Sequence, residues 1–276
     1  MKTVFLGAGS MAESILAGAL KNGALSKENI YMTNRTNKTR LVELQQKYDI
    51  NFSYDGEELL NGADIVILAM KPKDAAPALE DLKGLISVNT LIISVLAGIS
   101  INYIEDTLEF KGGIVRAMPN TSATIGKSAT GIAFNKGVTL TKQDLALSLF
   151  NSIGITTVIE EEKLDIVTAL SGSGPAYFYY IVEALLKTSE EMGLDQSLAK
   201  PLIIQTLLGA GEMLATSGQE AKTLRENVTS PGGTTEAGLF ALQKNQVNEA
   251  FNECLHEAAK QSQCLRELYQ SQAKSK

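Results

Sequence analysis

The sequence predicts two domains, an α/β domain over residues 1–160 and an all-α domain over residues 161–276. At 276 residues the chain exceeds the usual size of a single compact core. Its first part alternates short apolar runs with helical patterns. After the acidic run EEEK at residues 160–163, no convincing strand pattern follows and long helical periods take over. We therefore expect the α/β domain first and the helical domain second.

Short apolar runs are the expected strands of the first domain. They cover residues 3–6, 30–33, 64–70, 90–95, 113–118, 131–134 and 155–159. Because these runs are apolar throughout and helical segments separate them, we expect a parallel sheet covered by helices on both faces.

The second domain is expected to contain helices at residues 175–192, 196–216, 235–243 and 247 to about 271. In the helix at 196–216 the apolar positions form a stripe too wide for a single layer of helices. Burial against another subunit would explain this width. The sequence therefore predicts a homo-oligomer that assembles through its helical domain.

Composition and charge narrow the possible partners. Hydrophobic residues make up 44% and charged residues 20%, as in ordinary folded proteins. The net charge is −6 and the basic residues are scattered, so we expect no nucleic-acid partner and no membrane surface as a partner. Cys254 and Cys264 lie ten apart in an expected helix and face different directions, so no disulfide or metal site is predicted. Their free thiols fit a cytoplasmic location.

A glycine-rich turn follows the first expected strand. Gly7, Gly9 and Ala12 form a G-x-G-x-x-A pattern, with Ser10 and Met11 at the start of the next helix. In this context backbone amides and the helix dipole hold a pyrophosphate, which indicates a Rossmann-like dinucleotide-binding domain. A tight turn that simply requires small residues is the structural alternative.

The end of the second strand favours one dinucleotide. An NAD-binding protein usually carries an acidic residue there, whereas this chain has Asn34, Arg35 and Thr36. Arg35 and Thr36, with Lys38 or Arg40 as further candidates, would bind a 2′-phosphate through charge-assisted hydrogen bonds. NADPH is therefore the expected cofactor, with NADH possible. Alternatively, Arg35 is a solvated loop charge.

Ligands of open α/β sheets bind at the carboxyl ends of the strands. Lys71 precedes a proline and is therefore held extended, which directs it over this cleft. Taken singly, a residue at the end of a strand more often has a structural role than a role in cofactor binding. The further cofactor-binding residues predicted on this basis are Ala69, Met70, Lys71, Pro72, Ala97, Gly98 and Asn120.

The loop NVTSPGGTTEAG at residues 227–238 contains hydroxyls and glycines but no histidine, cysteine or lysine. Ser230 precedes a proline and is extended, Gly232 and Gly233 allow close backbone approach, and Thr234 and Thr235 begin the next helix. A small carboxylate would bind well to these amides. A capped turn between two helices is the structural alternative.

These motifs together resemble one family from end to end. GAGSMAESI, NR, MKP, SVLAGI, RAMPNTSA, ALSGSGPAYFY and VTSPGGTTEAGL follow in the order and at the intervals of the pyrroline-5-carboxylate reductases, and the last two are highly specific. The resemblance implies NADPH-dependent reduction of 1-pyrroline-5-carboxylate to L-proline, the final step of proline biosynthesis, with NADH used by some members. It also implies a Rossmann domain, a helical dimerisation and substrate domain, and homodimers that often assemble into homodecamers.

The resemblance also implies roles for individual residues. The hydroxyl of Thr235 faces the ring nitrogen of the substrate and is the catalytic group, while Ser230 and the amides of the glycine region receive the carboxylate. Asn227 corresponds to a position near the nicotinamide end of the cofactor. The implied substrate-binding residues are Ser230, Gly232, Gly233, Thr234 and Thr235.

Three positions depart from the family pattern. Ser122 and Leu96 are mild changes in two of the motifs. Gly56 stands where the family usually has an asparagine beside the cofactor, so a hydrogen-bonding side chain is missing from the expected ribose site.

Other functions remain open from the residues alone. A related imine reductase or a β-hydroxyacid dehydrogenase would share this architecture, but the latter needs a catalytic lysine shortly after the domain boundary, and Lys187 comes too late. A non-enzymatic NADP-sensing protein would keep the fold and lose the substrate loop, which is intact here. The sequence does not settle the ratio of NADPH to NADH use or whether the assembly is a dimer or a decamer. It also does not settle whether the substrate derives from glutamate or from ornithine.

Overall fold

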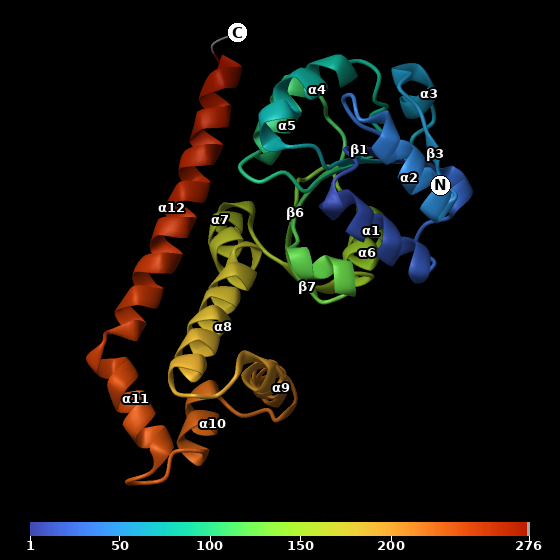
Figure 1. Cartoon of the computed structure of the whole chain (residues 1–276). Helices are drawn as coiled ribbons and strands as arrows, with labels where there is room; N and C mark the ends of the chain where they lie inside the picture. The colour runs from blue at the N-terminus through green and yellow to red at the C-terminus, as the bar shows by residue number, and fades with distance from the viewer. Residues whose placement is uncertain (275–276) are drawn as a thin grey trace. The chain divides into compact units, whose positions relative to one another are not determined.

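The structure is a computed structural model that describes residues 1–274 of the chain (Figure 1). It contains two compact units. The first comprises Met1–Pro175 together with the chain from Glu257 onward, and the second comprises Ala176–His256. The first unit thus extends beyond the expected boundary at residue 160 and includes the end of the last helix.

The first unit contains one eight-stranded sheet in the order β3-β2-β1-β4-β5-β6-β7-β8. Every strand expected from the sequence is present, and the two-residue β3 is additional because it is too short to show a pattern. The strands are β1 (Thr3–Leu6), β2 (Ile30–Thr33), β3 (Asn51–Phe52), β4 (Ile65–Leu68), β5 (Leu91–Ser94), β6 (Ile114–Met118), β7 (Ser128–Phe134) and β8 (Gly154–Val158).

The expectation of an entirely parallel sheet is wrong at one pair of strands. β7 runs antiparallel to β6, with Val115 opposite Phe134. Only residues 119–127, which contain the 3₁₀ helix η3 (Thr121–Ile125), connect these strands, and a parallel return needs a crossover of a dozen residues or more. β8 then pairs parallel with β7 after the crossover helix α6 (Leu140–Asn151).

Helices cover both faces of the sheet (Figure 1). On one face α1 (Ser10–Lys21), α2 (Lys38–Tyr48) and α6 bury side chains such as Ile15, Leu44 and Phe150. On the other face α3 (Gly56–Leu60), α4 (Ala75–Leu82) and α5 (Ile101–Leu108) bury side chains such as Leu79 and Ile104. Burial on both faces explains the continuous apolar character of the strands.

The first unit then continues into helices. A 3₁₀ turn, η4 (Glu161–Lys163), leads into α7 (Leu164–Val167), a π-helical turn, η5 (Thr168–Gly172), and α8 (Gly174–Glu191). A short 3₁₀ helix, η1 (Lys27–Asn29), precedes β2, and another, η2 (Pro72–Asp74), precedes α4.

The second unit consists of helices and turns only. It contains most of α8, followed by α9 (Gln196–Thr216), α10 (Ala221–Asn227), α11 (Thr234–Lys244) and the beginning of α12 (Val247–Lys274). The helices expected from the sequence are all present, and the short α10 is additional. None of the helices described in residues 1–274 is long and apolar enough to cross a membrane.

Polar contacts attach the end of α12 to the first unit. The buried Ser262 donates a hydrogen bond of 2.7 Å to Asp165, and Arg266 Nε lies 3.1 Å from the same carboxylate. Further along, Gln270 donates to Ser100 Oγ at 3.0 Å. These contacts explain why the last helix, although expected to belong to the helical domain, ends in the α/β unit.

Candidate active site

The turn between β1 and α1 brings two strand ends into close contact. Gly7 has φ +120°, a backbone conformation that other residues rarely adopt. A Cβ at this position would lie 2.4 Å from the backbone carbon and oxygen of Ala69, just after β4. Gly7 is therefore required for this turn to lie against the end of β4.

Gly9 is exposed and faces open space. It is the N-cap of α1 with ordinary extended angles, and a Cβ there would meet no atom within 4 Å. The next residue, Ser10, is also exposed, and the first amides of a helix have no partners within it. Ala12 is fully buried and Met11 packs against the core, so the helix lies tightly on the sheet. This turn therefore fits a pyrophosphate, which helix N-termini attract.

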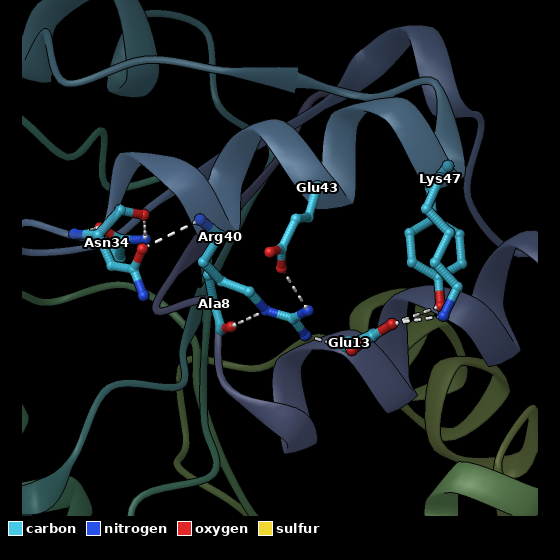
Figure 2. Close-up of polar contacts among 8 residues, drawn as sticks. Ala8, Glu13, Asn34, Arg40, Glu43 and Lys47 are labelled. Atoms are coloured by element: carbon cyan, nitrogen blue, oxygen red, sulfur yellow. Dashed lines mark hydrogen bonds and ion pairs between the residues drawn. The ribbon is translucent and has the colours of Figure 1, made fainter.

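The loop after β2 is held by Asn34. Its Oδ1 accepts hydrogen bonds from the backbone amide of Asn37 (2.8 Å) and the hydroxyl of Tyr54 (3.1 Å), and its Nδ2 donates to the carbonyl of Asn37 (2.7 Å). Figure 2 shows Asn34 at the beginning of α2. Asn34 therefore shapes the loop that carries the next two residues.

Arg35 and Thr36 are exposed at the tip of this loop. The Arg35 side chain is 84% exposed, and its Nη1 lies 3.2 Å from Asp74 Oδ1. Exposed ion pairs of this kind contribute little to stability, so Arg35 can exchange its carboxylate for another anion at small cost. Its position is consistent with binding of a 2′-phosphate.

Arg40 was a candidate for the same phosphate, but its guanidinium already has partners within the protein. Its Nε donates to the carbonyl of Ala8 (3.2 Å), its Nη1 to Glu43 (3.4 Å) and its Nη2 to Glu13 (Figure 2). All three nitrogens of the guanidinium thus have partners within the first unit. We therefore do not assign Arg40 to the 2′-phosphate.

The segment after β4 has the expected extended form. Lys71 is exposed with φ −72° and ψ 141°, and Pro72 begins η2 directly after it. Ala69 and Met70 are partly buried beside Gly7. The prediction of an extended Lys71 at this edge of the sheet is confirmed.

The segment after β5 packs against the last helix. Gly98 is buried with φ +74°, and a Cβ there would lie 3.3 Å from Leu265 Cβ in α12. Ala97 is partly buried beside it. Packing against α12 therefore explains why a glycine stands at position 98, in addition to the predicted contact of Gly98 with the cofactor.

Asn120, after β6, connects two of the motifs. Its side chain accepts from the amide of Ser122 (3.1 Å), and its Nδ2 donates to the carbonyl of Ser171 in the π-helical turn (3.0 Å). The motif ALSGSGP thus contacts the motif MPNTS within the first unit. The buried Asn120 has a structural role here, and its contact with the cofactor remains a prediction.

Sequence reasoning missed a buried charge at the same edge of the sheet. The side chain of Arg116 in β6 is only 4% exposed, and its Nη1 lies 3.1 Å from Glu161 Oε1. The same oxygen accepts from the amide of Ile101 at 2.8 Å. This pair fixes the beginning of α5. An arginine within the apolar run GIVRAM was the available signal, because a buried cation needs a partner.

The predicted substrate loop in the second unit is a tight turn. The amide of Gly233 donates to the carbonyl of Ser230 (3.0 Å), and Gly232 has φ +73°, as a type II turn with a proline at its second position requires. The amide of Gly232 donates to Glu236 Oε2 (2.7 Å). Both glycine amides that were expected to receive a carboxylate therefore have partners in this structure.

The first turn of α11 provides other amides. The first helical bond runs from the amide of Ala237 to the carbonyl of Gly233, so the amides of Thr234, Thr235 and Glu236 have no partner within the helix. Thr235 is half-buried in this turn, and Ser230 is exposed.

A groove of about 590 Å³ lies beside this turn within the second unit. Gly232, Gly233 and Glu236 line it, with Arg225 of α10 and Phe240 of α11. Asn227, expected at the nicotinamide end of the cofactor, is the last residue of α10 and donates to Gln219 (3.1 Å). It belongs to the second unit, whereas the other predicted cofactor residues belong to the first.

A doubly wound sheet with a glycine turn at the start of α1, joined to a helical unit, is typical of NAD(P)-binding oxidoreductases. Comparison with known families supports this class. Residues 2–98 match the family described as NADP oxidoreductase, coenzyme F420-dependent, and residues 161–265 match the pyrroline-5-carboxylate reductase dimerisation family. The chain belongs to the pyrroline-5-carboxylate reductase family, as its relatives show.

Two of these relatives are similar along nearly the whole chain. Pyrroline-5-carboxylate reductase 1 of Bacillus spizizenii is 47% identical over 261 residues, which cover 95% of this chain and 88% of that protein. Pyrroline-5-carboxylate reductase 2 of Bacillus subtilis is 46% identical over 270 residues, covering 97% of this chain and 96% of that protein.

Solved structures agree with this assignment. The Coxiella burnetii pyrroline-5-carboxylate reductase is 35% identical with a TM-score of 0.88, and the alignment covers 96% of this chain and 98% of that chain. The Plasmodium falciparum pyrroline carboxylate reductase, whose crystal structure has NADP bound, is 32% identical with a TM-score of 0.85 and the same coverage of both chains.

Proposed function

We propose that the protein catalyses the NAD(P)H-dependent reduction of 1-pyrroline-5-carboxylate to L-proline, the final step of proline biosynthesis. Family membership along nearly the whole chain supports this activity. The observation that carries the proposal is the turn from Ser230 to Gly233, which leads into the first amides of α11 and contributes hydroxyls with Thr234 and Thr235 but no histidine, cysteine or lysine.

The residues of the first unit fit a dinucleotide. The open face of Gly9 and the first amides of α1 would hold its pyrophosphate, and Arg35 with Thr36 would approach a 2′-phosphate. When bound, the cofactor supplies a hydride from C4 of its nicotinamide ring. Since no acidic residue stands after β2, we propose NADPH as the preferred form, with NADH as a weaker substitute.

The second unit would bind and polarise the imine. The hydroxyl of Ser230 and the helix amides from Thr234 onward would receive the carboxylate of the substrate. The hydroxyl of Thr235 would donate a hydrogen bond to the ring nitrogen, which makes C5 more electrophilic. As C5 accepts the hydride, the electron pair of the C=N double bond moves to the nitrogen, which carries one proton in the product. This proton is either present when the imine binds protonated, or it comes from the Thr235 hydroxyl, which solvent then reprotonates. General acid catalysis of this kind contributes about 10²- to 10⁴-fold, so one hydroxyl is adequate.

A turnover assay tests this function. Purified protein should oxidise NADPH when 1-pyrroline-5-carboxylate is added, and proline should form in equal amount. Binding of NADPH without turnover would instead support the non-enzymatic NADP-sensing alternative. Turnover of other cyclic imines or of hydroxyacids, but not of 1-pyrroline-5-carboxylate, would support the related imine reductase or the β-hydroxyacid dehydrogenase.

Arg35→Ala should change cofactor preference. We expect the KM for NADPH to rise several-fold while the KM for NADH stays nearly constant, because only NADPH carries the phosphate that Arg35 would bind through charge-assisted hydrogen bonds. Asp74→Asn is the matched control, since it breaks the same ion pair and leaves the cation in place. Steady-state kinetics with both cofactors would measure this change, and equal effects on the two cofactors would contradict the assignment.

The matched dimerisation segment indicates a homo-oligomer, and we propose a homodimer or a homodecamer built from such dimers. Exposed apolar side chains of the second unit, including Tyr180, Leu202 and Leu208 at 74%, 63% and 61% exposure, are too many for a free surface. Light scattering at low micromolar concentration should give at least twice 29.6 kDa. Leu202→Asp should lower this mass, and a stable, active wild-type monomer would contradict the proposal.

A further inference from the structure

Arg40 connects helix α2 to the glycine turn. Its backbone amide donates to Asn37 Oδ1 (3.0 Å), which caps α2 and fixes the origin of the side chain. From there its Nε reaches the carbonyl of Ala8, the residue between Gly7 and Gly9, at 3.2 Å. Figure 2 shows the guanidinium between Ala8 and Glu13. The arginine thus contacts both the turn and the first turn of α1.

The contact with Ala8 determines the direction of a neighbouring amide. A peptide unit is planar and trans, so its carbonyl and the following N–H point in opposite directions. Since Arg40 holds the carbonyl of Ala8, the N–H of Gly9 points away from the guanidinium. Gly9 is exposed and has open space at its Cβ position. The Arg40 contact therefore keeps this amide in one orientation, away from the guanidinium, in a turn that is open to solvent at Gly9.

The second contact concerns charge. Glu13 lies in the first turn of α1, where a carboxylate would oppose the binding of an anion. It accepts hydrogen bonds from Arg40, from Lys47 (2.8 Å) and from the hydroxyl of Tyr48 (2.9 Å), and its side chain is only 20% exposed. Burial alone would raise its pKa, but these donors lower the pKa to about 2, so Glu13 is ionised. Arg40 and Lys47 compensate its charge.

We infer that Arg40 is a positioning residue for the pyrophosphate of the cofactor: it orients the Gly9 amide through Ala8 and offsets the charge of Glu13. This inference rests on the dinucleotide binding that is part of the proposed function. It gives Arg40 a role distinct from that of Arg35, because the pyrophosphate is common to NADPH and NADH whereas the 2′-phosphate is not.

Direct binding of both cofactors tests the inference. Arg40→Met keeps the aliphatic stem and removes all donors, and it should raise the Kd for NADPH and for NADH by a similar factor of about tenfold. Arg40→Lys keeps the charge without the planar fork and should recover only part of this loss. Lys47→Met is the matched control, because Lys47 binds the same carboxylate without contacting the turn. Its Kd values should stay within about threefold of wild type.

The outcomes separate the possible roles. Thermal melting of each variant shows whether stability changes, and a purely structural role would lower the melting temperature while leaving both Kd values unchanged, which would overturn the inference. A loss confined to NADPH would also overturn it, since it would mark Arg40 as a ligand of the 2′-phosphate. If Arg40→Met does not fold, Arg40→Lys provides the comparison, since it should raise the Kd for NADPH and for NADH by a similar, smaller factor. A wild-type protein that binds neither cofactor would contradict the proposed function itself.

Discussion

Thr235→Ala is expected to lower kcat by about 10- to 10³-fold, because its hydroxyl is the group that we place against the imine nitrogen. Thr235 lies half-buried in the first turn of α11, so its backbone position is set by the helix. The affinity for NADPH should remain near wild type, since the predicted pyrophosphate and ribose contacts are in the other unit.

Two further variants make this expectation specific. Thr235→Ser keeps the hydroxyl and should retain much of the activity. Ser230→Ala should raise the KM for 1-pyrroline-5-carboxylate more than it lowers kcat, because binding of the carboxylate is equal in the ground state and the transition state. Steady-state kinetics with both substrates varied would separate these patterns. A nearly unchanged kcat in Thr235→Ala would mean that solvent or another group supplies the proton.

Hydrophobic runs predicted the strands well, but they carry no information on strand direction. β7 shows this limit, since GIAF is as apolar as its parallel neighbours and yet runs antiparallel to β6. The connection in the structure, residues 119–127, is too short for a crossover helix. The strand expected at 131–134 left residues 119–130, a length that still allowed a parallel return, so no signal of the reversal was present in the sequence.

The return of the last helix to the first unit could not be predicted from local patterns. Ser262 and Asp165 are separated by 97 residues, and Gln270 and Ser100 by 170. Polar side chains that meet only in the folded protein leave no periodic signal in the sequence. The sequence pattern predicted the last helix, but it did not show that the end of this helix belongs to the first unit.

In the candidate site, sequence motifs located the turns but not the partners of individual groups. Arg35 and Arg40 carry the same charge five residues apart, and only the structure shows that one is exposed while the other is bound to Ala8 and Glu13. The hydrogen bond from the Gly232 amide to Glu236 could have been predicted from the sequence. Glu236 is the third residue of α11, and an acidic residue there commonly reaches back to an amide before the helix.

The two glycines of the cofactor turn should respond in opposite ways to the same added methyl group. Gly7→Ala should destabilise the fold by at least about 3 kcal/mol, because alanine disfavours φ +120° and its Cβ would overlap the backbone of Ala69. Gly9→Ala should keep the free energy of unfolding within about 1 kcal/mol of wild type, since its angles are ordinary and its Cβ has space.

The affinity for the cofactor should depend on Gly9, although the stability of the fold does not. In Gly9→Ala the methyl group would occupy the open face on which the pyrophosphate is expected, so the Kd for NADPH and for NADH should both rise by about tenfold or more. Denaturant unfolding and titration of the two cofactors measure both quantities on the same samples. If Gly9→Ala bound both cofactors normally, the pyrophosphate would have to lie elsewhere, and the assignment of this turn would be wrong. If Gly7→Ala were as stable as wild type, the turn would have to relax away from Ala69, and the close contact between β1 and β4 ends would not be a requirement of the fold.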